Sequence, residues 1–296
     1  MTGLAFGHPG AEHEELLSRW TADPLVLSSL LVVGTAYALG TWRLWQRADL
    51  HRGVRVWQLG SFAAGWATVA LSLLSPLDAF SDISFAAHMA QHELLMLVAA
   101  PLLIFGRPLV VLLWSLPADA RRRVGLWVSR GGVAALWHGL TGPLVTLLLH
   151  ALAVWLWHIP FLFDAALADE RVHAVQHLSF FITAALFWWA VVHGRYGRVG
   201  YGISVLFVFA TALHQSVLGA LLTVGRFIWY PLAARRALDA GIDPLEDQQL
   251  AGVLMWVPSG IVFAVLGLAL FSAWLGDAQR RAQRRVYVGA PPQRPR

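Results

Sequence analysis

The chain has 296 residues, of which 57% are hydrophobic and only 13% are charged. Soluble domains usually carry about 25% charged residues, and several apolar runs here are long enough to cross a bilayer core of about 30 Å. Cysteine is absent, which excludes disulfides, thiolate metal sites and thiol redox chemistry. We therefore expect an all-α, polytopic membrane protein.

Seven apolar segments are predicted to span the membrane as helices. In chain order they cover residues 25–44, 56–74, 83–105, 142–158, 173–193, 201–224 and 250–275. Residues 1–24 form an N-terminal arm, residues 25–276 the membrane domain, and residues 277–296 a basic, disordered tail. The apolar stretch 109–116, between Pro108 and Pro117, is too short to span and is predicted to be re-entrant or interfacial.

The basic residues predict the orientation of these spans. All 22 are arginine, and most lie in the loops after the first, third and fifth spans and in the tail. Acidic residues show the opposite distribution, because only Asp49, Asp119 and Asp277 lie on the arginine-rich side. The positive-inside rule therefore places the N-terminus outside and the C-terminus in the cytoplasm. The basic tail is expected to contact anionic lipid headgroups and no nucleic acid.

Two histidine pairs open the third and fifth spans. His88 and His92 are four residues apart, as are His173 and His177, so each pair shares one face of its helix. With the predicted orientation both pairs lie on the outer side of the membrane. Helical positions at a similar depth add further candidates from the fourth, sixth and seventh spans: His150, His158, His214 and Met255.

Ionisable groups at membrane depth are costly and usually face the bundle interior. One such histidine is more often a hydrogen-bonding residue, but five or six at one depth indicate a shared ligand. Neutral imidazole is the commonest metal ligand. Imidazole and thioether without thiolate suit copper, whereas zinc gains nothing from methionine. His92, the deeper of its pair, is predicted to be a better ligand candidate than His88.

Polar neighbours of the two pairs complete the predicted site. Ligating histidines usually donate their second ring N–H to a polar group, and three residues could accept it: Gln91, Glu93 and Gln176. Acidic residues also line the predicted outer loops, namely Asp78, Asp82, Asp164, Asp169 and Glu170. They form either a solvated surface or an electronegative funnel that concentrates cations.

Four stretches resemble the polytopic CtaG family, the integral-membrane assembly factors of caa-type cytochrome c oxidases. The first is His88-Met-Ala-Gln-His92-Glu-Leu-Leu-Met96, followed by Ala100-Pro101 and Gly106-Arg-Pro108. The others are Trp155-Leu-Trp157-His158-Ile-Pro160 with Phe163-Asp-Ala-Ala-Leu167, His173-Ala-Val-Gln-His177-Leu-Ser-Phe-Phe, and Gln248-Gln-Leu-Ala-Gly252 through Met255-Trp-Val-Pro258. The resemblance covers residues 25–276.

This resemblance implies a non-enzymatic role in maturing a haem–copper oxidase, by supplying its copper, in the bacterial plasma (inner) membrane. The implied partners are oxidase subunits and a periplasmic copper donor. The residues alone leave other functions open. Histidines from different helices also ligate haem, which would make the chain a b-type haem protein or a haem-handling enzyme. Buried polar groups can mark a transport path, and a structural scaffold would leave the histidine layer unexplained.

Overall fold

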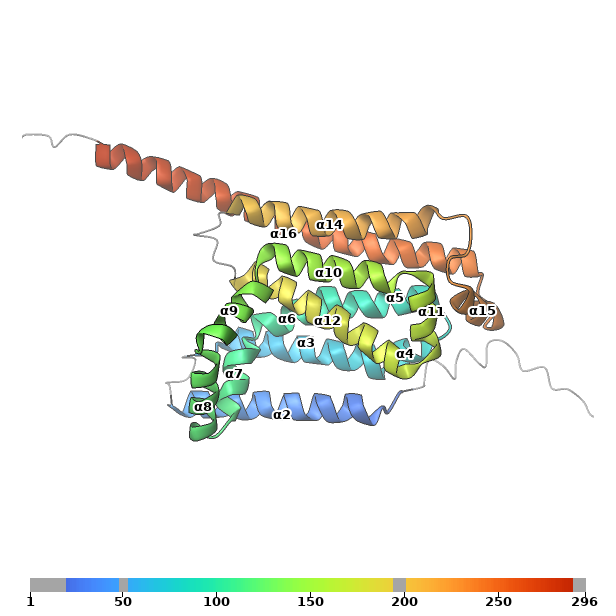
Figure 1. Ribbon diagram of the computed structural model, residues 1–296, viewed down its shortest axis with the longest axis horizontal. Coiled ribbons are helices and arrows are strands. Elements are labelled where there is room, and N and C mark those ends of the chain that lie inside the picture. Colours follow the sequence, from blue (N-terminus) through green and yellow to red (C-terminus); the bar gives the residue numbers. More distant parts are fainter. Residues whose placement is uncertain (1–19, 48–52, 194–200, 290–296) are drawn as a thin grey trace, which may run out of the picture.

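The computed structural model describes residues 20–47, 53–193 and 201–289, and every regular element within these ranges is a helix. The main helices run side by side as a bundle (Figure 1). They are α2 (Pro24–Arg47), α3 (Val56–Leu74), a continuous rod of α5 (Phe85–Glu93), η1 (Leu94–Ala99) and α6 (Ala100–Phe105), α10 (Pro143–Trp157), α12 (Glu170–His193), α14 (Tyr201–Val224) and α16 (Pro244–Gly289).

Short helices lie at the two ends of this bundle. One end carries α4 (Pro76–Ser81), α11 (Pro160–Ala168) and α15 (Pro231–Asp239), on the right in Figure 1. The other carries α7 (Pro108–Ser115), α8 (Ala118–Val128) and α9 (Gly131–Leu140), on the left. The first end is the one that the arginine distribution predicts to face outward, and α5 and α12 both begin there.

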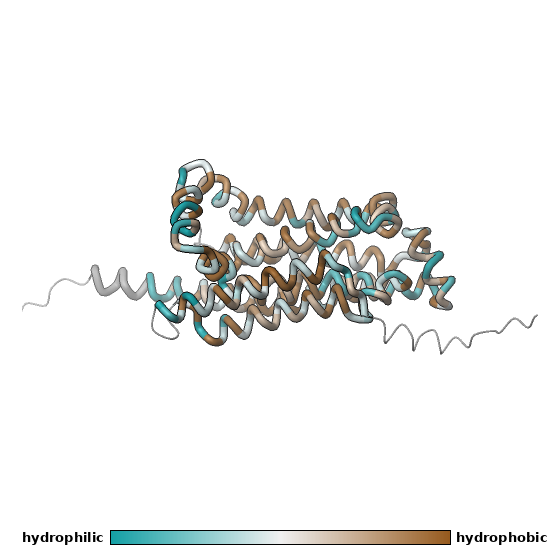
Figure 2. Tube along the Cα trace, turned by 90° about the horizontal axis from the view of Figure 1, so that it is seen from below, coloured by the Kyte–Doolittle hydropathy of each residue, from teal (hydrophilic) through white to brown (hydrophobic). Residues whose placement is uncertain are grey.

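The bundle has the surface of a membrane protein. Leu31 of α2, Leu206 of α14 and Leu268 of α16 are 65%, 66% and 67% exposed, and hydrophobic residues run along the helices while hydrophilic ones gather towards the ends (Figure 2). Large exposed apolar surfaces of this kind require a lipid environment. The chain is therefore a multi-pass membrane protein, as predicted.

The described helices provide five or six candidate membrane spans. Five described helices are long and apolar enough to cross a membrane, and a sixth span results if α9 and α10, bent by 62°, are taken together. The helix α3 has the bounds predicted for the second span but is not among these. Seven spans, and the orientation of the termini, stay predictions.

The C-terminal part of the membrane domain differs from the prediction. The helix α16 continues past Asp277 to Gly289, so the prediction of disorder is wrong for residues 277–289. The Asp277 carboxylate pairs with Arg281 and, at 3.8 Å, with Arg280, and such pairs three and four residues apart support a helix. Residues 290–296, and residues 1–19 of the N-terminal arm, lie outside the described ranges.

The short apolar stretch after the rod of α5, η1 and α6 forms α7, which packs against α2. A Cβ atom on Gly40 would lie 2.0 Å from the Val111 carbonyl oxygen, so only glycine permits this approach. Arg43 of α2 also donates to the Ser115 carbonyl. The structure thus gives this stretch protein contacts at the α7–α9 end of the bundle, and its depth in the membrane stays a prediction.

The rod that begins with α5 changes its pitch midway. Residues Leu94–Ala99 form the π-helical turn η1, which ends two residues before Pro101. Proline has no N–H, so the Leu97 carbonyl cannot accept the usual helical hydrogen bond, and the wider turn accommodates the defect. Such π-turns occur frequently at functional sites, and this one directly follows His92 and Glu93.

The helices α14 and α16 approach each other closely at two glycines. A Cβ atom on Gly252 would lie 2.6 Å from the Gly219 carbonyl oxygen, and one on Gly219 would lie 2.9 Å from the Gly252 carbonyl oxygen. Small residues allow membrane helices to pack backbone against backbone. Gln215 and Met255, one turn away from these glycines, are thereby brought to the inner side of the helix pair, where both are buried.

Candidate metal centre

The helices α5 and α12 are built alike at their N-termini. Ser84 Oγ accepts a hydrogen bond from the Ala87 N–H at 3.1 Å, and Asp169 Oδ1 accepts one from the Arg171 N–H at 2.7 Å. These side chains cap the two helices and set where each begins. Counted from Phe85 and Glu170, each helix carries histidines at its fourth and eighth positions. The two pairs therefore lie equally deep at the same end of the bundle.

A carboxylate from α16 fixes the start of α5. Asp247 is buried and accepts hydrogen bonds from the Phe85 N–H at 2.6 Å, the Ala86 N–H at 3.1 Å and the Ser84 hydroxyl at 2.7 Å. A carboxylate at this position also interacts favourably with the helix dipole. Sequence analysis missed Asp247, because its partners lie more than 160 residues away along the chain.

The two histidine pairs form one cluster. His88, His92, His173 and His177 can each offer a ring nitrogen, and these atoms all lie within 4.8 Å of one another. The ring centroids of His92 and His177 are 4.8 Å apart, and those of His88 and His173 are 5.1 Å apart. A tetrahedral ion with bonds of about 2.0–2.1 Å requires nitrogens about 3.3 Å apart, so modest ring rotations would enclose one ion.

Six of the cluster's eight ring nitrogens have no hydrogen-bond partner among the described residues. Both ring nitrogens of His88 and His92, and the Nε2 atoms of His173 and His177, are buried without a hydrogen-bond partner among the described residues. Leaving a buried polar atom unsatisfied costs about 1–3 kcal/mol, and a bound cation would remove that cost. Phe180 packs edge-on against His92, with ring centroids 4.8 Å apart, and shields the cluster from the bundle core.

A small cavity adjoins the cluster at His92. Its lining comes from α5, η1, α10, α14 and α16 and comprises Met89, His92, Glu93, Met96, Val154, His158, Gln215 and Met255. The chain contains four methionines, and all except Met1 line this cavity. Its volume is about 10 Å³, which accommodates one particle of the size of a water molecule. We refer to it as the methionine cavity.

His158 contributes an unused nitrogen to the lining of the methionine cavity. Its Nδ1 lies 2.7 Å from the Val154 carbonyl oxygen, so Nδ1 carries the hydrogen and Nε2 keeps its lone pair in the neutral ring. That Nε2 is buried and has no partner among the described residues. The Tyr230 hydroxyl donates to the His158 carbonyl at 3.0 Å. The bond from Nδ1 to the Val154 carbonyl is of the kind that commonly orients a metal-ligating histidine, whose second nitrogen faces the metal.

The family model of the cytochrome c oxidase caa3 assembly factor (Caa3_CtaG) matches residues 35–277. The chain belongs to this family. The match includes every residue of the four-histidine cluster and of the methionine cavity, and it confirms the resemblance found in the sequence motifs.

Three mycobacterial proteins, each named as uncharacterised, are similar to this CtaG-family protein. Those of Mycobacterium bovis and Mycobacterium tuberculosis are each 25% identical over 282 residues, which is 91% of this chain and 41% of theirs. That of Mycobacterium leprae is 24% identical over 280 residues, or 90% of this chain and 41% of its own. The chain thus spans about two fifths of the length of these relatives. No solved structure matches it significantly.

Two predicted ligands of the CtaG-family protein lie outside the cluster. His150 Nδ1 is 3.1 Å from Thr183 Oγ1 and its Nε2 is 3.0 Å from Gln215 Nε2, so both nitrogens already have partners. His214 lies beside it, with ring centroids 6.1 Å apart. The ring nitrogens of His150 are therefore engaged within the protein, whereas both ring nitrogens of His214 are buried without a partner among the described residues, so the ligand role of His214 stays a prediction. Depth along a helix does not determine the direction in which a side chain points.

The predicted hydrogen-bond partners of the ligating rings are also placed differently. The Gln91 amide donates to the Ser72 carbonyl at 2.7 Å and to Asp78 Oδ1 at 2.9 Å, so it ties α5 to α3 and α4 rather than to a histidine. Glu93 lines the methionine cavity. Gln176 is fully buried, and its amide atoms have no partner among the described residues, so its role stays a prediction.

Three of the acidic residues near the cluster make structural contacts. Asp78 accepts from Gln91, and Asp82 pairs with Arg236 at 3.8 Å. Asp169 caps α12, as described above. Burial raises the pKa of the Asp164 carboxyl. These contacts favour the structural interpretation of the outer acidic residues over an open, electronegative funnel.

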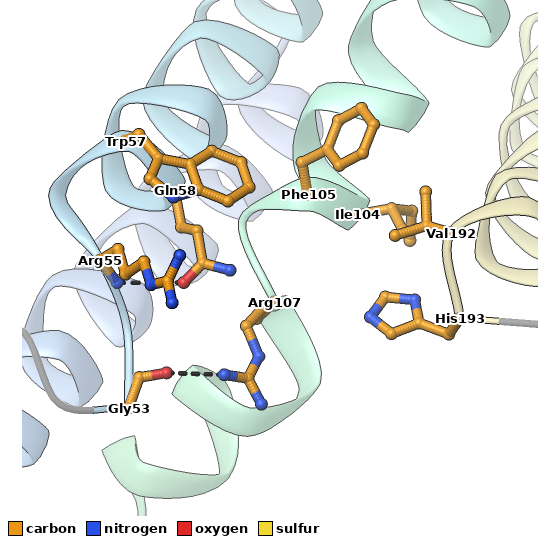
Figure 3. Close-up of a pocket in the computed structure, with 9 residues that line it drawn as sticks. All are labelled: Gly53, Arg55, Trp57, Gln58, Ile104, Phe105, Arg107, Val192 and His193. Atoms are coloured by element: carbon orange, nitrogen blue, oxygen red, sulfur yellow. Dashed lines mark hydrogen bonds between the residues drawn. The ribbon is translucent and has the colours of Figure 1, made fainter. Parts of the chain in front are cut away.

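A wide hollow lies at the opposite end of α12 from the cluster. It has a volume of about 510 Å³, and its lining includes Arg55, Arg107 and His193, the last residue of α12. Figure 3 shows Arg107 reaching the Gly53 carbonyl, a hydrogen bond of 2.9 Å. Two guanidinium groups repel cations. The arginines therefore disfavour cation binding in this hollow.

Proposed function

We propose that this protein is an assembly factor for a haem–copper cytochrome c oxidase and that it binds copper at the four-histidine cluster. Family membership supports the assembly role. The observation that carries the metal assignment is the convergence of four imidazoles from α5 and α12 to within 4.8 Å of one another. Their buried nitrogens have no partner in the described part of the chain, so a cation would supply the missing interaction.

Copper fits the surroundings of the cluster better than zinc. Four imidazoles alone would accept either ion. However, Met89, Met96 and Met255 lie next to His92 in the methionine cavity, and thioether sulfur favours Cu(I). In this proposal copper is the cargo of the protein, which holds the ion and passes it on, and no catalysed reaction is needed.

The location of the cluster fits delivery. The histidines occupy the fourth and eighth positions of α5 and α12, near the end of the bundle that the arginine distribution predicts to face the periplasm. Copper would arrive there from a periplasmic donor and leave laterally to an oxidase subunit in the same plasma membrane. Because only two helices supply the ligands, a small change in their spacing would open the site.

Haem is less compatible with this geometry. A porphyrin between two axial histidines needs space on the scale of several hundred Å³, whereas the cavity beside His92 is about 10 Å³. We therefore expect purified protein to lack the strong visible absorption band of haem. A stoichiometric haem spectrum would overturn the copper proposal.

Metal content of purified variants tests the copper site directly. We expect the wild type, loaded with copper and desalted, to retain the ion, and His92→Ala together with His177→Ala to lose it. His138→Ala is the matched control, because His138 is exposed on α9 and bonds only to the Ala134 carbonyl. The paired His→Gln exchanges, which keep polar side chains, guard against misfolding. Unchanged copper content in well-folded double variants would refute the assignment.

The assembly role is tested in cells from which the gene is deleted. We expect the oxidase subunits to persist in the membrane but to contain less copper, and oxidase activity to recover when copper is added to the medium. Complementation with wild type should restore activity, and complementation with the His92→Ala, His177→Ala variant should not. Fully metallated, active oxidase in the deletion strain would contradict the proposal.

A further inference from the structure

The methionine cavity has the composition of a second metal position. Met89, His92, Glu93 and Met96 lie three or four residues apart on α5 and η1, so they present one face. Met255 approaches from α16 and His158 from the end of α10. Three thioethers would be an unusual concentration by chance, since they are the only internal methionines in the chain.

The cavity also collects polar atoms without partners. They are both ring nitrogens of His92, Nε2 of His158 and Oε1 of Gln215, all buried and unsatisfied within the described ranges. Gln215 is held in place because its other amide atom contacts His150, which in turn contacts Thr183. The role of His150 is thus to orient a cavity residue rather than to bind metal.

Glu93 adds a carboxylate to this apolar region. No hydrogen bond or ion pair in the described part of the chain involves the side chain of Glu93, which is half-buried. A carboxylate at membrane depth is costly unless a positive charge offsets it. A cation in the cavity would provide that charge.

We infer that the methionine cavity is a Cu(I)-selective position, distinct from the four-histidine cluster and joined to it by His92. Its thioethers and the His158 imidazole form a soft ligand set that prefers Cu(I) to Zn(II). The inference rests on the proposed function, and it adds the oxidation state and a second location for the ion. His92 can keep its bond to Cu(I) while imidazole ligands are replaced by thioethers, so movement between the positions needs no electron transfer.

X-ray absorption of the purified protein, loaded with Cu(I) under anaerobic conditions, tests this inference. The wild type should show sulfur as well as nitrogen scatterers. Met89→Leu, Met96→Leu and Met255→Leu combined should remove the sulfur scatterers and one bound Cu(I), since exchanges between Met and Leu preserve volume. Leu95→Met is the control, because it alters a buried neighbour of Met96 that does not line the cavity, and it should bind as wild type does.

A double variant of the four-histidine cluster separates this inference from the proposed function. His173→Ala with His177→Ala should remove the nitrogen-only position and leave sulfur-bound Cu(I) in place. If wild type binds Cu(I) without sulfur scatterers, or the triple leucine variant binds as much Cu(I) as wild type, the methionine position is refuted while the four-histidine cluster stands. If neither set of variants changes copper binding, both assignments fail.

Discussion

The Asp247 carboxylate accepts a hydrogen bond of 2.6 Å from the Phe85 N–H, which joins the start of α16 to the start of α5. This contact holds the N-terminus of the helix that carries His88 and His92. The same carboxylate also binds the Ala86 N–H and the Ser84 hydroxyl. The position of half of the four-histidine cluster therefore depends on a residue from the last helix of the bundle.

Replacement of Asp247 should weaken both folding and metal binding. Asp247→Ala leaves buried N–H groups of α5 unsatisfied, which we expect to cost about 1–3 kcal/mol, and Asp247→Asn should cost less because its amide oxygen still accepts. Thermal unfolding in detergent and copper titration measure the two effects. Glu246→Gln, at the exposed neighbouring residue, should change neither. Wild-type stability of Asp247→Ala would show that the contact is dispensable.

The two groups of histidines should respond differently to substitution. His150→Ala removes a ring that partners Gln215 and Thr183, so we expect it to lower stability by about 1–3 kcal/mol without abolishing binding at the four-histidine cluster. His177→Ala should abolish metal binding at the four-histidine cluster with little loss of stability, since its Nε2 has no partner among the described residues. Unfolding curves measured beside metal content distinguish them. Equal loss of copper in both variants would contradict the assignment of a stabilising role to His150 and a ligand role to His177.

The glycine contact between α14 and α16 should tolerate no side chain. Gly252→Ala would place a Cβ atom 2.6 Å from the Gly219 carbonyl oxygen, and such overpacking costs about 1–3 kcal/mol. Gly260→Ala on the same helix meets nothing within 4 Å and should be neutral or stabilising, because alanine favours helix by about 1 kcal/mol over glycine. Melting temperatures in detergent should rank Gly260→Ala above Gly252→Ala. The opposite order would show that the helices separate at no cost.

The absence of cysteine allows a clean test of membrane orientation. A single cysteine replacing Asp169, which is exposed at the histidine end, should react with a membrane-impermeant maleimide in intact spheroplasts. A cysteine replacing Arg122, exposed on α8 at the other end, should react only after the membrane is permeabilised. Labelling in the reverse pattern would place the four-histidine cluster on the cytoplasmic side and remove the periplasmic delivery route.

Several features were predictable because their causes are local. The apolar runs and the low charge follow from composition, and they predicted an all-helical membrane protein. The helices α3, α12 and α14 begin and end close to the predicted bounds, since polar and charged residues mark the ends of apolar runs. The spacing of four residues placed each histidine pair on one helix face. The tail prediction was wrong over 277–289, because basic composition suggested disorder while ion pairs with Asp277 support a helix there.

By itself, the sequence determined the membrane class, the approximate helices and the two histidine pairs, because hydropathy and helical periodicity depend on residues close together in the chain. The tertiary structure decided which of these residues meet. It joined His88 and His92 to His173 and His177, turned His150 towards Thr183 and Gln215, and gathered the three internal methionines around one cavity. Such contacts depend on the rotation of each helix about its axis, which is set by packing between distant segments such as Gly219 against Gly252.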